Sequence, residues 1–140
     1  MQEYIRHSQL VKHLDAALKL REAMIEKKIE IMEQMLPKGF DFSREKVQNS
    51  GGINPFDRYL EALEKAGIDD KVLSESKTIV DELFEMVQLS EREIRKSGHT
   101  YDRFYVLKVI EKRPMWQVEK RMNYSHAQAW RIWKIIKKNL

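Results

Sequence analysis

Residues 114–140 read PMWQVEKRMNYSHAQAWRIWKIIKKNL and predict two helices joined by a tight turn. Pro114 fits the first position of a short helix that runs to about Arg121. Asn123 suits the left-handed backbone conformation that such a turn requires, and Ser125 is a good N-cap for the second helix. A short helix, a tight turn and a second helix rich in Arg and Lys form the layout of a helix-turn-helix.

The predicted last helix has one apolar side. Its apolar residues recur at three- and four-residue steps: Ala129, Ile132, Trp133, Ile136 and Leu140. This spacing is typical of an amphipathic helix that packs one side against a core. A helix of this kind could also simply cap a helical bundle, with Trp130 and Trp133 both packed inward.

The polar residues of this helix are of the kinds that contact DNA. In a helix-turn-helix the second helix enters the major groove and its first turns reach the base edges. Gln pairs with adenine and Arg with guanine through two hydrogen bonds each, and Ala contacts the thymine methyl group. The residues expected at or near the bases are Ser125, His126, Ala127, Gln128, Trp130, Arg131 and Lys134. The residues expected beside phosphates are Lys120, Arg121, Lys137 and Lys138. Arg131 is the strongest candidate, whereas His126 fits a DNA contact and a passive surface position equally well.

The positive charge of the chain is concentrated at this end. Residues 112–140 hold eight basic residues and one acidic residue, Glu119, a net charge of +7. The other 111 residues hold 18 basic and 21 acidic ones, so the total of +4 combines a basic end with a slightly acidic body. This asymmetry favours binding to a polyanion such as nucleic acid. The alternative is a solvated, lysine-rich helix end.

The run 123–132, Asn-Tyr-Ser-His-Ala-Gln-Ala-Trp-Arg-Ile, also resembles a family signature. It is similar to the G-Y-S-x-x-x-V-Y-R-I pattern in the C-terminal helix-turn-helix of small phage regulators, the RinA/ArpU-type late-gene activators. These regulators in turn resemble the promoter-reading region 4 of bacterial sigma factors. Ser125, Arg131 and Ile132 match the pattern residue by residue, whereas Asn123 stands where the family usually has Gly. The resemblance implies a DNA-binding transcription regulator, with RNA polymerase as a further partner.

Two long helices are predicted earlier in the chain. The apolar residues of the helix over 3–36 recur at helical spacing: Val11, Leu14, Leu18, Ile25, Ile29, Met32 and Leu36. The helix over 69–96 has a matching series: Val72, Ser76, Ile79, Leu83, Met86, Ser90 and Ile94. A long helix with so narrow an apolar side needs a partner helix. We therefore expect an antiparallel hairpin, and a homodimer formed through these helices.

The shorter elements complete an all-α fold. A loop over about 37–54 separates the first long helix from a short one, in which Asn54 is the N-cap, Pro55 the first residue and Gly67 the residue past the end. Thr100 is the expected N-cap of a further helix over 101–112.

The expected fold class is therefore a long, coiled-coil-like helical hairpin followed by a three-helix, helix-turn-helix domain. The hairpin domain covers residues 1–97 and is the expected oligomerisation or partner-binding arm. The helix-turn-helix domain covers residues 98–140.

The composition excludes several classes of protein. With 42% hydrophobic and 34% charged residues, the chain is too apolar for a disordered protein and too charged for a membrane protein. The absence of Cys excludes disulfides, zinc fingers, iron–sulfur clusters and thiol catalysis. No apolar run approaches the ~18–20 residues of a membrane helix, and no apolar signal segment follows Met1. We therefore expect a cytoplasmic protein that contacts no membrane.

No catalytic or cofactor motif is visible in the sequence. The four His are scattered without an H-x-x-x-H pair, so we expect no metal. The pair Gly51-Gly52 is not followed by the GK[ST] of a phosphate loop, and there is no nucleophile elbow. We expect a protein that is not an enzyme and binds no cofactor.

Two other functions fit the same pattern. A DNA-packaging protein like a phage terminase small subunit also joins a helix-turn-helix to oligomerising helices. A helical interaction protein, such as an anti-sigma or scaffold factor, would bind no DNA at all.

Overall fold

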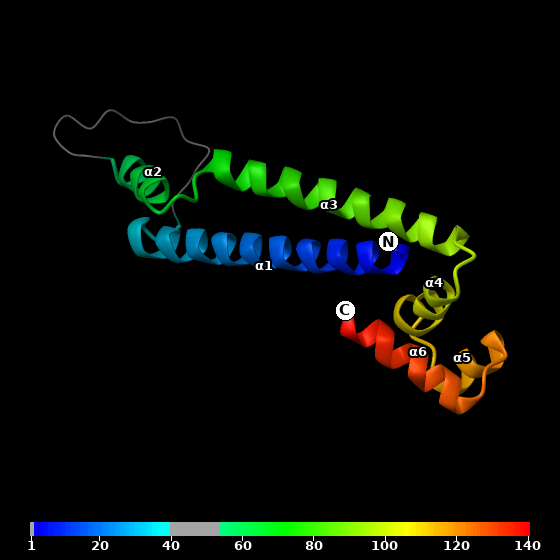
Figure 1. Cartoon of the computed structure of the whole chain (residues 1–140). Helices are drawn as coiled ribbons and strands as arrows, with labels where there is room; N and C mark the ends of the chain where they lie inside the picture. The colour runs from blue at the N-terminus through cyan, green and yellow to red at the C-terminus, as the bar shows by residue number, and fades with distance from the viewer. Residues whose placement is uncertain (1, 40–53) are drawn as a thin grey trace. The chain divides into compact units, whose positions relative to one another are not determined.

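The computed structural model describes residues 2–39 and 54–140. All regular structure in these two ranges is helical (Figure 1). In chain order the elements are α1 (Glu3–Met35), α2 (Pro55–Lys65), α3 (Asp70–Lys96), α4 (Thr100–Tyr105), the π-helix η1 (Val106–Ile110), α5 (Met115–Met122) and α6 (His126–Lys138). The predicted all-α class is confirmed. Residues 40–53 of the predicted loop, including the Gly51-Gly52 pair, lie outside the described residues.

The limits of α2 follow from local sequence signals. Oδ1 of Asn54 accepts a hydrogen bond from the backbone N–H of Phe56 at 3.0 Å, so Asn54 caps the helix and Pro55 is its first residue. Gly67 follows the end of the helix with a φ of +71°, in the left-handed region that glycine adopts without strain. Both predictions are confirmed.

Two predicted helix starts are wrong by one residue. Thr100 is the first residue of α4 rather than its cap, because Nδ1 of His99 accepts the hydrogen bond from the N–H of Tyr101 at 3.2 Å. Pro114 has an extended backbone, with φ −64° and ψ 155°, and precedes α5. Proline has a φ near −65° in both helical and extended conformations, so its position alone does not separate the two placements.

The helix predicted over 101–112 is divided. Its second half is the π-helix η1, in which the N–H of Glu111 donates to the carbonyl of Val106 at 2.8 Å, five residues earlier. Lys112 then takes a φ of +52°, which ends the helix. π-Turns arise from tertiary packing rather than from an apolar repeat, so the pattern of the sequence does not predict them.

Helix α3 buries the predicted side at five of seven positions: Val72, Ser76, Leu83, Ser90 and Ile94. Its buried and half-buried residues follow a seven-residue repeat: Leu73, Ser76, Val80, Leu83, Val87, Ser90 and Ile94. Ile79 and Met86, which the prediction placed inward, are 52% and 44% exposed. The prediction followed the larger apolar residues, whereas Val80 and Val87, one position later in each case, keep the 3.5-residue period.

The inward positions of helix α1 have the same 3.5-residue spacing. Its inward positions are His7, Leu10, Leu14, Ala17, Arg21, Met24, Lys28 and Ile31. Four residues of the predicted apolar series are half-buried, namely Leu14, Ile25, Met32 and Leu36, whereas Val11, Leu18 and Ile29 are exposed. Several inward positions carry polar residues, which a search for apolar periodicity overlooks.

The described residues form two compact units, and both long helices contribute to each. The unit Ala16–Val80 has a small core of four buried residues: Ile31, Tyr59, Leu63 and Ile68. An ion pair between Nζ of Lys28 and Oδ1 of Asp70, 3.1 Å apart, joins α1 to α3 in this unit. The division into functional domains at residues 97 and 98 stays a prediction.

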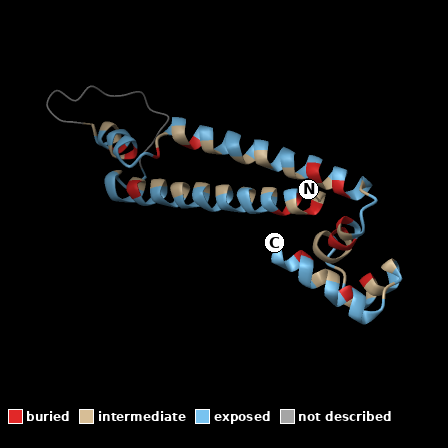
Figure 2. Cartoon of the chain, in the orientation of Figure 1, coloured by how far each residue is buried: buried red, intermediate tan, exposed pale blue. Residues whose placement is uncertain are grey.

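The second unit contains the residues up to Asp15 and those from Asp81 onward. Its core consists of eight buried residues: Tyr4, Ile94, Phe104, Tyr105, Val106, Val118, Ala129 and Ile136. Figure 2 colours buried positions red along the ribbon. Ile132, Trp133 and Leu140 pack against this core, so the predicted apolar side of the last helix is confirmed. Every helix of this unit contributes to one core, and that core fixes which side of α6 faces solvent.

Candidate nucleic-acid interface

The turn between α5 and α6 has the predicted conformation. Asn123 has φ 57° and ψ 44°, in the left-handed region. The N–H of Tyr124 donates to the carbonyl of Glu119 at 2.9 Å, which closes the end of α5 as in a Schellman motif. Asn is one of the few residues besides Gly that adopts this conformation readily. Asn123 therefore forms this turn without a glycine.

Ser125 and Gln128 form a capping box at the start of α6. Oγ of Ser125 accepts from the N–H of Gln128 at 3.2 Å, and Oε1 of Gln128 accepts from the N–H of Ser125 at 3.1 Å. The predicted N-cap is confirmed. A paired contact to adenine needs both atoms of the Gln amide, so this geometry favours a structural role for Gln128.

His126 contacts α5, although most of its side chain is exposed. Its Nδ1 donates to Oε1 of Glu119 at 2.6 Å, and its ring lies edge-on to Trp130 at a centroid distance of 5.8 Å. This bond joins the first turn of α6 to the middle of α5. Trp130 itself is exposed, so the arrangement in which both tryptophans pack inward is wrong.

A basic strip runs along the solvent side of α6. Ala127, Arg131, Lys134 and Lys138 are spaced by four, three and four residues, which places them on one side of the helix, opposite the buried Ala129 and Ile136. All four are exposed, and α6 contains no acidic residue. Among the described residues, the three bases have no hydrogen-bond or ion-pair partner. This basic strip therefore carries three charges that nothing in this unit neutralises.

Lys137 lies at the edge of the basic strip and has a different environment. Its Nζ is 5.6 Å from the centroid of the Trp133 ring, and Nζ of Lys108 is 5.5 Å from the same ring. Lys108 lies in the apolar run that forms η1, outside the basic segment 112–140. Only the fold brings it to α6, so charge counting along the chain does not find it.

The two residues of α5 that were predicted to contact phosphates, Lys120 and Arg121, lie in different surroundings. Lys120 is exposed and lies one turn beyond Trp116, which is 62% exposed. Arg121 is also exposed, but it lines a pocket together with Arg95 and Arg103. The structure therefore does not group Arg121 with the basic strip.

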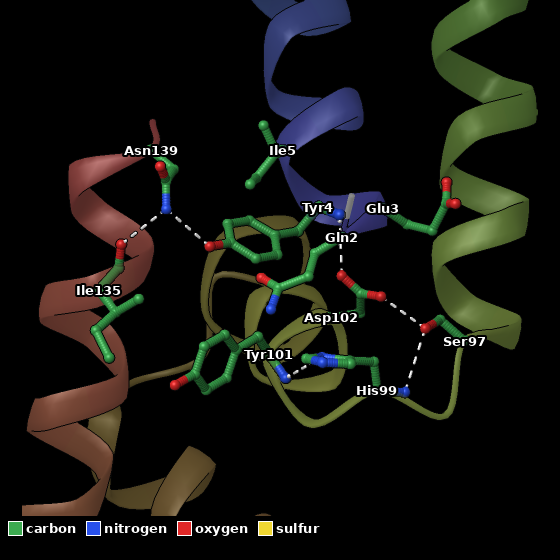
Figure 3. A pocket seen from close by; sticks show the side chains of 10 residues that line it. All are labelled: Gln2, Glu3, Tyr4, Ile5, Ser97, His99, Tyr101, Asp102, Ile135 and Asn139. Atoms are coloured by element: carbon green, nitrogen blue, oxygen red, sulfur yellow. Dashed lines mark hydrogen bonds between the residues drawn. The ribbon is translucent and has the colours of Figure 1, made fainter.

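The end of α6 is held by the first turn of α1 (Figure 3). Nδ2 of Asn139 donates to the hydroxyl of Tyr4 at 3.0 Å. The N–H of Tyr4 donates to Oδ1 of Asp102 at 2.9 Å, and Oγ of Ser97 donates to Oδ2 of Asp102 at 2.6 Å. The buried Asp102 carboxylate thus lies at the N-terminus of α1, where negative charge is stabilised by the helix dipole. These bonds fix α4 and α6 against the same turn.

Other kinds of site find no support in residues 2–39 and 54–140. No cluster of three or more His, Asp or Glu in these ranges could hold a metal ion. None of the helices described has both the length and the apolar character needed to cross a membrane. Comparison of the chain with profiles of known protein families, with curated proteins and with solved structures finds no match.

Proposed function

We propose that this chain binds double-stranded DNA by placing α6 in the major groove, with α5 and α6 acting as a helix-turn-helix. The basic strip is the observation that carries the proposal. It presents Arg131, Lys134 and Lys138 without acidic neighbours or partners, on a helix whose start is fixed by a capping box. The phosphate backbone of DNA attracts basic side chains that lie on one side of a helix and have no acidic partner.

The basic strip supports distinct roles for its residues. Arg131 lies two turns into α6, where it would pair with the O6 and N7 of a guanine. Lys134 and Lys138 would follow the phosphates, with Lys120 and Lys137 at the edges. His126 would hold α6 in place through Glu119 rather than contact a base.

The biological role that fits best is a phage-type transcription regulator that reads promoter DNA and contacts RNA polymerase. The hairpin of long helices would join two copies. Exposed apolar side chains on these helices support this part of the proposal: Val11, Leu18, Leu20 and Ile29 on α1, and Ile79, Phe84, Met86 and Leu89 on α3. The same residues favour a second candidate, a packaging protein of the terminase small-subunit type. Light scattering separates the two, since a regulator would form a dimer and a packaging protein a larger ring.

The test is fluorescence anisotropy with a labelled random duplex, titrated across salt concentrations. For four to six phosphate contacts, the logarithm of the affinity should fall by about 4 to 5 for each tenfold rise in salt. The double variant Arg131→Ala with Lys134→Glu should lose this binding. Its control is Arg92→Ala with Lys77→Glu, the same charge change at two exposed positions of α3. Absence of binding at low salt, or equal loss in both variants, would exclude α6 as the DNA-reading helix.

A further inference from the structure

A second basic feature lies apart from α6. A pocket of about 390 Å³ opens between α3, α4, η1 and α5. It is lined by Ile94, Arg95, Arg103, Val106, Leu107, Glu111 and Arg121, and by no residue of α6. The lining thus includes three arginines and one glutamate.

The carboxylate of Glu111 is already shared between two arginines. Nε of Arg113 lies 3.0 Å from its Oε2, and Nη1 of Arg95 lies 3.8 Å from its Oε1. Arg95 also pairs with Glu91 at 3.0 Å. Arg95 and Arg113 together therefore match the two acidic residues charge for charge.

Arg103 and Arg121 are left without compensation. Both side chains are exposed, and within the described ranges neither has a hydrogen-bond or ion-pair partner. Two like charges that line one pocket repel each other. A dianion between them would relieve this repulsion, and guanidinium groups match the oxygens of a phosphate through paired hydrogen bonds.

Part of the pocket lining is apolar. Ile94 and Val106 are buried and expose little surface, whereas the half-buried Leu107 is accessible. A volume of about 390 Å³ falls within the range of small-molecule sites, roughly 300–1,000 Å³. The pocket thus offers charged side chains for an anion and one accessible apolar side chain, Leu107, for the group that carries it.

We propose that this pocket binds a small phosphorylated molecule, with Arg103 and Arg121 holding its terminal phosphate and Leu107 contacting its apolar part. A phosphate monoester carries close to two negative charges at neutral pH, which matches the two uncompensated arginines. A phosphodiester of duplex DNA, by contrast, carries only one negative charge and lies on a convex backbone. It would not place an apolar group against Leu107. Because Arg103 belongs to α4 and Arg121 to α5, the bound phosphate joins these two helices.

The test is a titration of the intact chain with inorganic phosphate and with phenyl phosphate at constant ionic strength, followed by amide NMR shifts. We expect saturable binding at one site, tighter for phenyl phosphate, with shifts at α4 and α5. Arg103→Gln with Arg121→Gln should weaken binding at least tenfold. The matched control, Lys77→Gln with Arg92→Gln, removes two exposed charges of α3 outside the pocket and should stay within twofold of the wild type.

Three results would overturn the proposal. They are the absence of saturable binding, equal weakening in both double variants, and a loss of duplex DNA affinity specific to the pocket variant, which would assign the two arginines to DNA. Thermal melting of the variants checks that each one folds. Because the phosphate titration contains no DNA, its outcome is independent of whether α6 binds DNA.

Discussion

Nδ1 of His7 and the hydroxyl oxygen of Tyr105 lie 2.7 Å apart inside the unit that contains α6. Burial lowers the pKa of His7 below its ordinary 6.5, although the negative charge of Glu91 acts in the opposite direction. Burial and the same Glu91 raise the pKa of Tyr105 to about 12. His7 is therefore neutral at pH 7, and the core contains a polar pair whose state depends on pH.

We expect the protein to lose stability as the pH falls below about 6.5. The unfolded chain binds a proton at His7 near pH 6.5, whereas the folded chain resists it to a lower pH, so protons favour unfolding. The contribution of neutral His7 is complete above pH 6.5 and is lost as the pH falls toward the lowered pKa of the folded state. Urea unfolding followed by Trp fluorescence at several pH values measures this. His7→Gln should flatten the dependence, while the exposed His13→Gln should retain it; identical profiles would contradict the assignment.

Tyr4→Phe should destabilise the protein by about 0.5–1.5 kcal/mol, because it removes the hydroxyl that accepts from Asn139 and keeps the buried ring. Tyr101→Phe is the matched control. Tyr4 and Tyr101 line one pocket (Figure 3), and the hydroxyl of Tyr101 has no hydrogen-bond partner among the described residues. Chemical denaturation compares the two variants. Equal free energies of unfolding would mean that the Tyr4–Asn139 hydrogen bond does not stabilise the fold.

Lys112→Gly should stabilise the protein by about 1 kcal/mol relative to Lys112→Ala. Both changes remove the same charge, but only Gly adopts the φ of +52° without strain. The difference between the two free energies of unfolding isolates the backbone term. A more stable Ala variant would mean that the entropy which Gly adds to the unfolded chain exceeds the strain.

Arg131→Ala should weaken binding to a selected cognate duplex by about 1–3 kcal/mol if the guanidinium pairs with a base. The loss on random duplex should be smaller, since only phosphate contacts act there. Anisotropy on both duplexes at one salt concentration makes the comparison. An identical loss on the two duplexes would place Arg131 among the phosphate contacts.

Local signals placed most helix ends to within one residue, whereas the apolar repeat gave the buried sides of the long helices only in part. Asn54, Asn123 and Ser125 act within a few residues of their position, so their types indicate the caps and the turn directly. Which side of α1 is buried depends on α3 and on α4. His7, for example, faces inward because its ring bonds to the hydroxyl of Tyr105. These two residues are 98 positions apart, so a local sequence pattern does not predict this contact.

Part of the candidate site also follows from local sequence, and part of it depends on tertiary structure. The spacing of Arg131, Lys134 and Lys138 predicts their common side once the apolar side of α6 is known. The engagement of Gln128 in the capping box and of His126 with Glu119 depends on how the turn closes. Lys108 and the pair Arg103 and Arg121 come from other elements, so only tertiary structure shows their surroundings.

The contacts of Tyr4 also determine in which order parts of the chain can fold during translation. A ribosome releases Tyr4 long before Asp102 and Asn139, which lie 98 and 135 residues further along the chain. Until then the first turn of α1 has none of these partners, whereas α4, η1, α5 and α6 can pack through short-range contacts as soon as they emerge. We infer that the helices from α4 to α6 assemble locally and that the first turn of α1 joins them last.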